Sequence, residues 1–260
     1  DGDEQDIQQQ TVTITDDEAV PQVRLSVSGT TMNEVGSTTT VTVTATSTEL
    51  AQSNIVVSLK KNTGSALNGL DFNIADTITI LAGTTTGSTT LSVVNDDLYE
   101  LDEQAVIEIT SVSNGVKAAD TQSVTVTVKS EDTKPTVQLL AGQEFISEGS
   151  ATAASSTAVT AKLSALSGLP VTVTFAKSNS SAKDVSDYLL NESSVTVPAG
   201  VLTASVTLSS VHDELDESDE TVTISILGVD QHGTILNGAQ QATVTIEDND
   251  ALPVVTLGVG

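Results

Sequence analysis

Short runs in which apolar and polar residues alternate are the most regular feature of this chain, and they are rich in Val, Ile and Thr. In the first half of the chain we place seven such runs, at 22–28, 38–47, 54–61, 77–81, 88–95, 104–112 and 122–129. Alternation with a period of two puts the apolar side chains of a strand on one face. The connections are short, the Asn114-Gly115 pair is typical of a tight hairpin, and no segment of helix length is left over. The pattern predicts an all-β fold made of antiparallel sandwiches.

The alternating runs recur as a repeat of about 115 residues, which is a usual domain length. A Pro-led strand pattern occurs three times, each time after a Val-Thr-rich run and an acidic stretch, at 21–25, 135–139 and 253–257. We therefore expect two complete modules in tandem, at 21–134 and 135–252. Residues 1–20 are expected to be the last strand of a preceding repeat or a linker, and 253–260 the first strand of a following repeat.

The composition excludes several classes of chemistry. The chain has no cysteine, which excludes disulfides, zinc–thiolate sites and thiol nucleophiles. Its net charge of −26 argues against nucleic acid and anionic membrane surfaces as partners. No run approaches the roughly 18 apolar residues of a membrane span, so we expect no membrane insertion. Aromatic residues make up 2% of the chain, so each module must build its core mainly from aliphatic side chains.

The acidic residues are concentrated in a few loops. When the strands of a sandwich alternate in direction, every second connection lies at the same end, and the segment after the last strand emerges there too. In the first module this end receives Glu34, Asp71, the acidic run at 96–103, and Glu131 with Asp132. The second module repeats the arrangement with Glu148, Asp187, the run at 213–220 and the segment 248–250. Most of the 35 acidic residues therefore fall at one end of a module.

Two readings of this acidity predict different placements of charge. Acidity that only keeps an extracellular or salt-adapted protein soluble would be spread over the strand faces. Carboxylates crowded into a few loops repel one another unless a cation neutralises them. Ca²⁺ accepts six to eight oxygen ligands in a flexible shell, whereas Mg²⁺ suits all-protein cages less well. Zn²⁺ favours imidazole or thiolate, and the chain has two His and no Cys. The pattern favours calcium.

The same residues resemble the Calx-β domain, the calcium-binding module of sodium–calcium exchangers and of large bacterial surface proteins. The resemblance rests on the Glu after the first strand, the pairs Asp71-Phe72 and Asp187-Tyr188, an Ala-Gly turn before the fifth strand, and the acidic runs at 95–103 and 212–220. It implies a seven-stranded, immunoglobulin-like sandwich in each module. It also implies the Ca²⁺ ligands, which would be Glu34, Asp71, Asp96, Asp97, Glu100, Glu103, Glu131 and Asp132 in the first module, and Glu148, Asp187, Asp213, Glu217, Glu220, Asp248 and Asp250 in the second.

Four positions depart from the family pattern. The first acid of the long acidic loop is replaced by Asn95 in the first module and by His212 in the second. The acidic triplet after the last strand contains Ser130 in the first module and Asn249 in the second. Asparagine still offers a carbonyl oxygen, but serine and histidine are poorer Ca²⁺ ligands. We therefore expect one or two ions per module.

The repeat, the absence of cysteine and the acids at the module junctions favour a structural role. We expect extender modules of a large extracellular, adhesin-type surface protein, with calcium stiffening the junctions between neighbouring repeats of the same chain. Such a protein would meet a surface protein or glycan ligand through other domains. The alternatives are a calcium-sensing regulatory module and a non-catalytic accessory module of a secreted enzyme. We expect no catalysis by the chain itself, because His212 and Asp213 lack a nucleophile pattern, and His212 is expected to be a solvated loop histidine.

Overall fold

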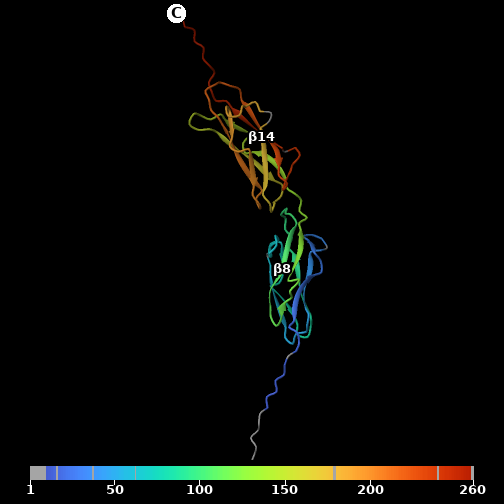
Figure 1. Ribbon diagram of the computed structural model, residues 1–260. Helices are drawn as coiled ribbons and strands as arrows, with labels where there is room; N and C mark the ends of the chain where they lie inside the picture. The colour runs from blue at the N-terminus through green and yellow to red at the C-terminus, as the bar shows by residue number, and fades with distance from the viewer. Residues whose placement is uncertain are drawn as a thin grey trace, which may run out of the picture. The chain divides into compact units, whose positions relative to one another are not determined.

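A computed structural model of the chain describes residues 10–258 except 16, 37, 62, 178, 179 and 239. The described residues divide into two compact units, both built of strands and loops (Figure 1). The first unit comprises the chain up to Val94 together with Glu103–Lys129, and the second comprises Asn95–Asp102 and the chain from Ser130 onward. Among these residues, none forms a helix of the length and apolar character that a membrane crossing requires.

The first sandwich contains strands β1 to β10, which form two five-stranded sheets. The order in one sheet is β5 (Phe72–Asn73), β7 (Thr86–Val93), β3 (Thr40–Ser47), β1 (Gln22–Val27) and β9 (Val116–Lys117). The order in the other is β2 (Thr31–Asn33), β10 (Ser123–Lys129), β8 (Glu103–Val112), β4 (Ile55–Lys60) and β6 (Thr77–Ile80). The all-β sandwich predicted from the alternating pattern is confirmed.

The seven expected strands of this sandwich are all present, within two residues at each end, but the described residues hold ten strands rather than seven. The additional strands β2, β5 and β9 have two or three residues each, which is too short for a period of two to show in the sequence. The sheets are also not wholly antiparallel, because β9 pairs in parallel with β1 and β2 in parallel with β10. The first strand of the fold thus switches sheets between β1 and β2.

The second sandwich, β11 to β20, repeats the same strand order. One sheet contains β15 (Tyr188–Leu190), β17 (Thr203–Ser210), β13 (Ser156–Leu163), β11 (Thr136–Ala141) and β19 (Thr234–Ile235). The other contains β12 (Phe145–Ser147), β20 (Gln241–Glu247), β18 (Glu220–Val229), β14 (Val171–Lys177) and β16 (Ser194–Val197). A register shift occurs at the same place in both sandwiches, between β4 and β8 in one and between β14 and β18 in the other. The internal repeat is therefore structural as well as sequential.

Each sandwich has its own core of mainly aliphatic side chains from the inward faces of its strands. Phe175 of β14 and two rings at equivalent positions are the aromatic members of these cores. The equivalent pair is Phe72 at the start of β5 and Tyr188 at the start of β15. The exposed fractions of Phe72 and Tyr188 are 0% and 1%, so both rings are fully buried in the cores of their sandwiches. Burial of such a ring contributes about 2–3 kcal/mol, and it fixes the loop that carries the preceding aspartate, Asp71 or Asp187.

Residues 10–15 and 253–258 form no strand, and side chains such as Ile14 and Leu257 are more than 90% exposed. A strand needs a partner to bond its N–H and C=O groups, and the described residues offer none to these segments. Residues 1–9, Asp16 and 259–260 lie outside the described part. The assignment of 1–20 and 253–260 to neighbouring repeats stays a prediction.

Candidate metal centre

Six acidic side chains of the second sandwich line one hollow at the end where β17 finishes and β18 begins. They come from five loops or strand ends: Glu148 follows β12, Asp187 precedes β15, Asp213 and Glu217 lie between β17 and β18, Glu220 opens β18, and Asp248 follows β20. The antiparallel order of the strands brings these segments to the same end. Six of the seven residues expected to bind the ion in this module thus surround one space. Their role as ligands stays a prediction.

Three of these carboxylates form an all-oxygen group. Asp187, Glu217 and Glu220 each place one carboxylate oxygen within 4.8 Å of the others. Burial raises the pKa of Glu220 to about 7, assisted by a hydrogen bond to Asp187 and by the negative charges of Asp187 and Glu217, and opposed by Lys183. The protein alone therefore disfavours three ionised carboxylates here, and a divalent cation would relieve that repulsion.

The aspartate of this group is oriented by its own loop. One Asp187 carboxylate oxygen accepts a hydrogen bond from the Lys183 N–H, and the Asp187 N–H donates to the Lys183 carbonyl at 3.0 Å. In the first sandwich the Leu67 N–H donates to Asp71 Oδ2 at 2.6 Å, which is the same arrangement. The buried ring that follows each aspartate and these backbone bonds hold the carboxylate in place before any ion binds.

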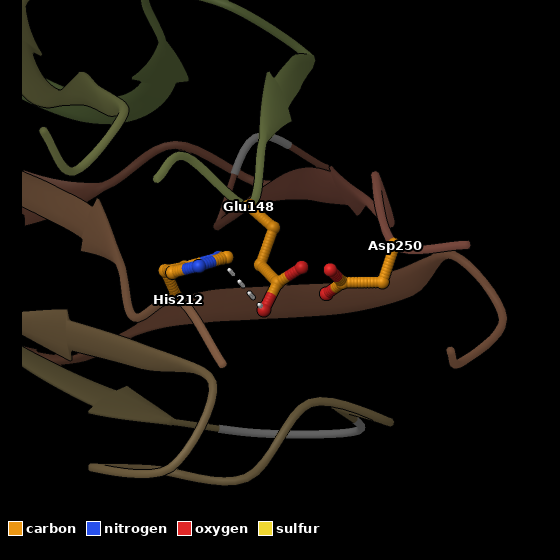
Figure 2. A group of neighbouring side chains, drawn as sticks. All are labelled: Glu148, His212 and Asp250. Atoms are coloured by element: carbon orange, nitrogen blue, oxygen red, sulfur yellow. Dashed lines mark ion pairs between the residues drawn. The ribbon is translucent and has the colours of Figure 1, made fainter. Parts of the chain in front are cut away.

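Glu148, His212 and Asp250 form a second group, which Figure 2 shows with the three side chains converging. One ligand atom from each lies within 4.8 Å of the others, and His212 Nδ1 is 3.8 Å from Glu148 Oε1. Glu148 is only 9% exposed, and Oε1 accepts a 2.7 Å hydrogen bond from the Asp213 N–H. Burial raises the pKa of Glu148, the backbone bond lowers it, and the nearby Asp250 raises it further.

The expectation that His212 is a solvated loop histidine is wrong, because its side chain is only 19% exposed. His212 stands two residues after the end of β17, and its ring faces Glu148 (Figure 2). In the sequence His212 is a departure that weakens a site, whereas in the structure its ring lies close to two of the expected ligands, Glu148 and Asp250. The clue available in the sequence was its alignment with a ligand position, one residue before Asp213.

Three buried atoms of this group accept no hydrogen bond and donate none within the described part of the chain: Glu148 Oε2, His212 Nδ1 and Asp250 Oδ2. An unsatisfied buried polar atom costs about 1–3 kcal/mol. Side chains that converge on one point and leave such atoms unsatisfied fit a bound cation. The neighbouring oxygens of Asp187, Glu217 and Glu220 supply the hard donors that Ca²⁺ prefers.

Asn249 has a different role from the carbonyl donor that the sequence suggested. Its side-chain amide donates to Ser147 Oγ at 3.1 Å and to the Gly149 carbonyl at 2.8 Å. These bonds tie the segment after β20 to the loop after β12. Asn249 therefore positions its neighbours Asp248 and Asp250.

The candidate ligands of the first module are divided between the two units. In the first unit, Glu34 follows β2 and is 6% exposed, while Asp71 and Glu103 have carboxylate oxygens within 4.8 Å of each other. The second unit contains the others, which are Asp96, Asp97, Glu100, Glu131 and Asp132. Burial raises the pKa of Asp132, and the charges of Asp96, Asp97 and Glu131 raise it further. These four acids therefore lie close enough to repel one another.

The long acidic loop has the same local turn in both repeats. Asp96 Oδ1 accepts from the Leu98 N–H at 2.8 Å, and Asp213 Oδ1 accepts from the Leu215 N–H at 2.8 Å. Within the second unit, the buried Tyr99 N–H donates to the Leu166 carbonyl at 3.3 Å. Tyr99 is only 8% exposed, so its ring anchors the acidic loop by packing.

One family profile matches this chain, and several solved structures resemble it. The Calx-beta domain profile matches residues 16–132 and 130–250. The crystal structure of CBD12 from CALX1.2 is 14% identical, with 86% of this chain and 99% of that chain covered and a TM-score of 0.37. The apo form of the Calx CBD1 domain is 17% identical, with 44% and 99% covered and a TM-score of 0.37. A two-domain protein of unknown function from Bacteroides fragilis NCTC 9343 is 11% identical, with 88% and 93% covered and a TM-score of 0.35. No curated protein matches.

Proposed function

Because the chain belongs to the Calx-beta family, whose domains bind calcium, we propose that it consists of tandem structural modules of an extracellular surface protein that calcium stiffens. The Calx-beta domain is a non-catalytic calcium-binding module. That this chain lacks catalysis of its own stays a prediction. The proposal concerns three further points: which residues hold the ion, what the bound ion does, and where the protein works.

The observation that carries the proposal is the hollow lined by six carboxylates in the second sandwich. Asp187, Glu217 and Glu220 offer converging oxygens. The raised pKa of Glu220 indicates that the negative charge of this group is not fully compensated by the protein. Asp213, Asp248 and Glu148 lie around the same hollow and complete a shell of oxygen donors. This supply matches the six to eight oxygens that Ca²⁺ takes.

Asp71 and Glu103 correspond to Asp187 and Glu220 in the repeat, and their converging oxygens support an equivalent site in the first module. The remaining ligands there follow the same correspondence. In the sequence repeat, Glu34 corresponds to Glu148, Asp96 to Asp213, Glu100 to Glu217, and Asp132 to Asp250, while Asp97 follows Asp96 and Glu131 precedes Asp132 in the chain. We propose one or two ions in each module.

The structural role is supported by the way the acidic loops are joined to the rest of the sandwich. Bonds such as that from Asp213 N–H to Glu148 and those of Asn249 link three loops before any ion is bound. An ion there adds further links among segments that are already ordered. Asp132 stands a few residues before β11, so calcium at this point restricts the segment that joins the modules. Millimolar extracellular calcium would keep sites of 10⁻⁴–10⁻³ M affinity occupied.

Calorimetry on the full chain in calcium and in chelator tests the proposal. At 100 times the dissociation constant, a ligand that binds only the folded state adds about 2.7 kcal/mol of stability. We expect a higher melting temperature in Ca²⁺, and a smaller increase in Glu220→Gln. Glu144→Gln is the matched control, since Glu144 is exposed and lies outside the hollow. Equal melting temperatures in calcium and chelator would contradict the proposal.

Small-angle scattering separates the structural role from calcium sensing. Stiffening predicts a narrower distribution of shapes in Ca²⁺, with each sandwich unchanged. A sensor predicts a large calcium-driven rearrangement within a sandwich. Scattering that is identical with and without Ca²⁺, while binding is measurable, would rule out both roles and favour an accessory module whose sites only stabilise it.

A further inference from the structure

The second sandwich contains a histidine inside its acidic end. His212 follows β17, and its ring faces the Glu148 carboxylate and, beyond it, Asp250 (Figure 2). The three residues come from separate loops, after β17, β12 and β20. Each contributes one ligand atom to a group in which all three atoms lie within 4.8 Å of one another.

The ligand atoms of this group are buried and unsatisfied. Glu148 is 9% exposed, and its Oε1 is already used by the Asp213 N–H, which leaves Oε2 without a hydrogen-bond partner among the described residues. His212 Nδ1 and Asp250 Oδ2 are also buried without a hydrogen-bond partner among the described residues. The distance of 3.8 Å between His212 Nδ1 and Glu148 Oε1 is too long for a hydrogen bond. Buried polar groups in folded proteins are ordinarily satisfied, so three such atoms around one point indicate an absent partner that accepts electron pairs from both nitrogen and oxygen.

A nitrogen donor changes the metal that the group selects. Ca²⁺ and Mg²⁺ are hard ions that take oxygen ligands. Imidazole suits Zn²⁺ and the other late first-row divalent ions, and Zn²⁺ binds readily to sets of histidine and carboxylate with water in the remaining position. We propose that Glu148, His212 and Asp250 form a transition-metal site, with Zn²⁺ as its ion, beside the all-oxygen group of Asp187, Glu217 and Glu220.

The first module provides an internal comparison. Glu34 and Asp132 correspond to Glu148 and Asp250, but the position of His212 is occupied by Asn95. An amide offers no nitrogen lone pair to a metal. The proposed site is therefore specific to the second module. It shares Glu148 with the hollow proposed to hold calcium, and it goes beyond the calcium proposal because its choice of metal depends on His212.

Zinc titration of the full chain tests this inference. The protein is first stripped with chelator, and Zn²⁺ alone is then titrated by calorimetry into wild type, His212→Asn and His232→Asn. His212→Asn gives the second module the residue that the first module already has. His232 is the matched control, because it is the only other histidine and its Nδ1 lies 3.0 Å from the Pro170 carbonyl in a different loop. Long-range ¹H–¹⁵N spectra then report on two imidazoles only.

We expect wild type and His232→Asn to bind one Zn²⁺ through a histidine, with a large shift of the His212 ring nitrogen. His212→Asn should bind at least about 100-fold more weakly, since loss of even a supporting partner of a metal ligand costs 10–100-fold. Circular dichroism and calcium binding of His212→Asn show whether it remains folded. Equal zinc affinity in His212→Asn, or zinc binding that leaves the His212 ring unshifted, would overturn the inference. Absence of zinc binding would also overturn it, and retained calcium binding in that case would leave the calcium proposal standing.

Discussion

The main-chain N–H of Asp213 donates a 2.7 Å hydrogen bond to Oε1 of Glu148, which joins the loop after β17 to the loop after β12. One carboxylate oxygen of Glu148 is thus used to hold the fold together, while the other, Oε2, is buried without a hydrogen-bond partner among the described residues. The same side chain has a structural role and a proposed metal-binding role, and substitutions can separate the two.

Glu148→Gln should raise stability without metal and lower the gain from Ca²⁺. Glutamine keeps an oxygen that accepts the Asp213 N–H, but it removes a buried negative charge beside Asp250. Thermal melts in chelator and in Ca²⁺ measure both effects. Glu148→Leu also removes the acceptor, so it should destabilise the chelated protein by about 1–3 kcal/mol. Equal melting temperatures of Glu148→Gln and Glu148→Leu in chelator would show that the hydrogen bond from Asp213 contributes nothing to stability.

Stability without metal should fall as pH rises from about 4.5 to about 7. The pKa of Glu220 is raised from 4.5 to about 7 in the folded state, so in this window the folded protein keeps a proton that the unfolded chain has released. The stabilisation is complete below the unfolded pKa and is lost as pH rises through the folded pKa. Burial raises the pKa of Glu148 and Asp132 in the same direction. Denaturant titrations in chelator at several pH values measure this slope.

Two changes should flatten that slope. Saturating Ca²⁺ keeps Glu220 ionised in the folded state, and Glu220→Gln removes the titrating group. Calcium binding near pH 7 should also release protons, which calorimetry in buffers of different ionisation enthalpy detects. A slope that persists unchanged in Glu220→Gln would assign the pH dependence to other groups.

Phe72→Ala should destabilise the first sandwich by about 3–5 kcal/mol, because the ring is 0% exposed and truncation leaves a cavity in an otherwise aliphatic core. Phe145→Ala is the control, since that ring is 59% exposed at the edge strand β12. The prediction is checked by chemical denaturation. A loss below about 1 kcal/mol for Phe72→Ala would show that the ring does not anchor the loop of Asp71.

Gly83→Ala and Gly200→Ala should each cost about 1–2 kcal/mol. These residues have φ angles of 74° and 72° in the equivalent turns before β7 and β17, in the left-handed region that an L side chain disfavours. A Cβ at either position meets no atom within 4 Å, so backbone conformation alone carries the cost. Gly228→Ala is the control, because a Cβ at Gly228 also meets no atom within 4 Å, while the φ angle of Gly228 is not positive. Chemical denaturation of the three variants measures these costs. Equal midpoints for Gly83→Ala, Gly200→Ala and the control would refute the explanation from backbone conformation.

The long strands and the convergence of the acidic loops could be predicted from the sequence because both follow from a period of two and from strand parity. Glu220 and Asp187 lie far apart in the chain, yet alternation of strand direction alone places them at one end. The short strands could not be predicted, because β5 and β9 have two residues each and depend on partners distant in the sequence.

The inward position of His212 could not be predicted either. Histidine is common on loop surfaces, and only the packing of three loops shows that this ring is covered and faces Glu148. The role of Asn249 could not be predicted from the sequence, because a side-chain amide can either donate or accept hydrogen bonds. In the structure the neighbouring Ser147 hydroxyl and Gly149 carbonyl make it a donor.

Long-wavelength anomalous diffraction from crystals grown in Ca²⁺ tests the central claim most directly. The account predicts an anomalous calcium peak in the hollow of the second sandwich, within ligand distance of oxygens of Asp187, Glu217 and Glu220. Well-ordered loops with no anomalous peak in that hollow, at calcium concentrations that raise the melting temperature, would contradict it.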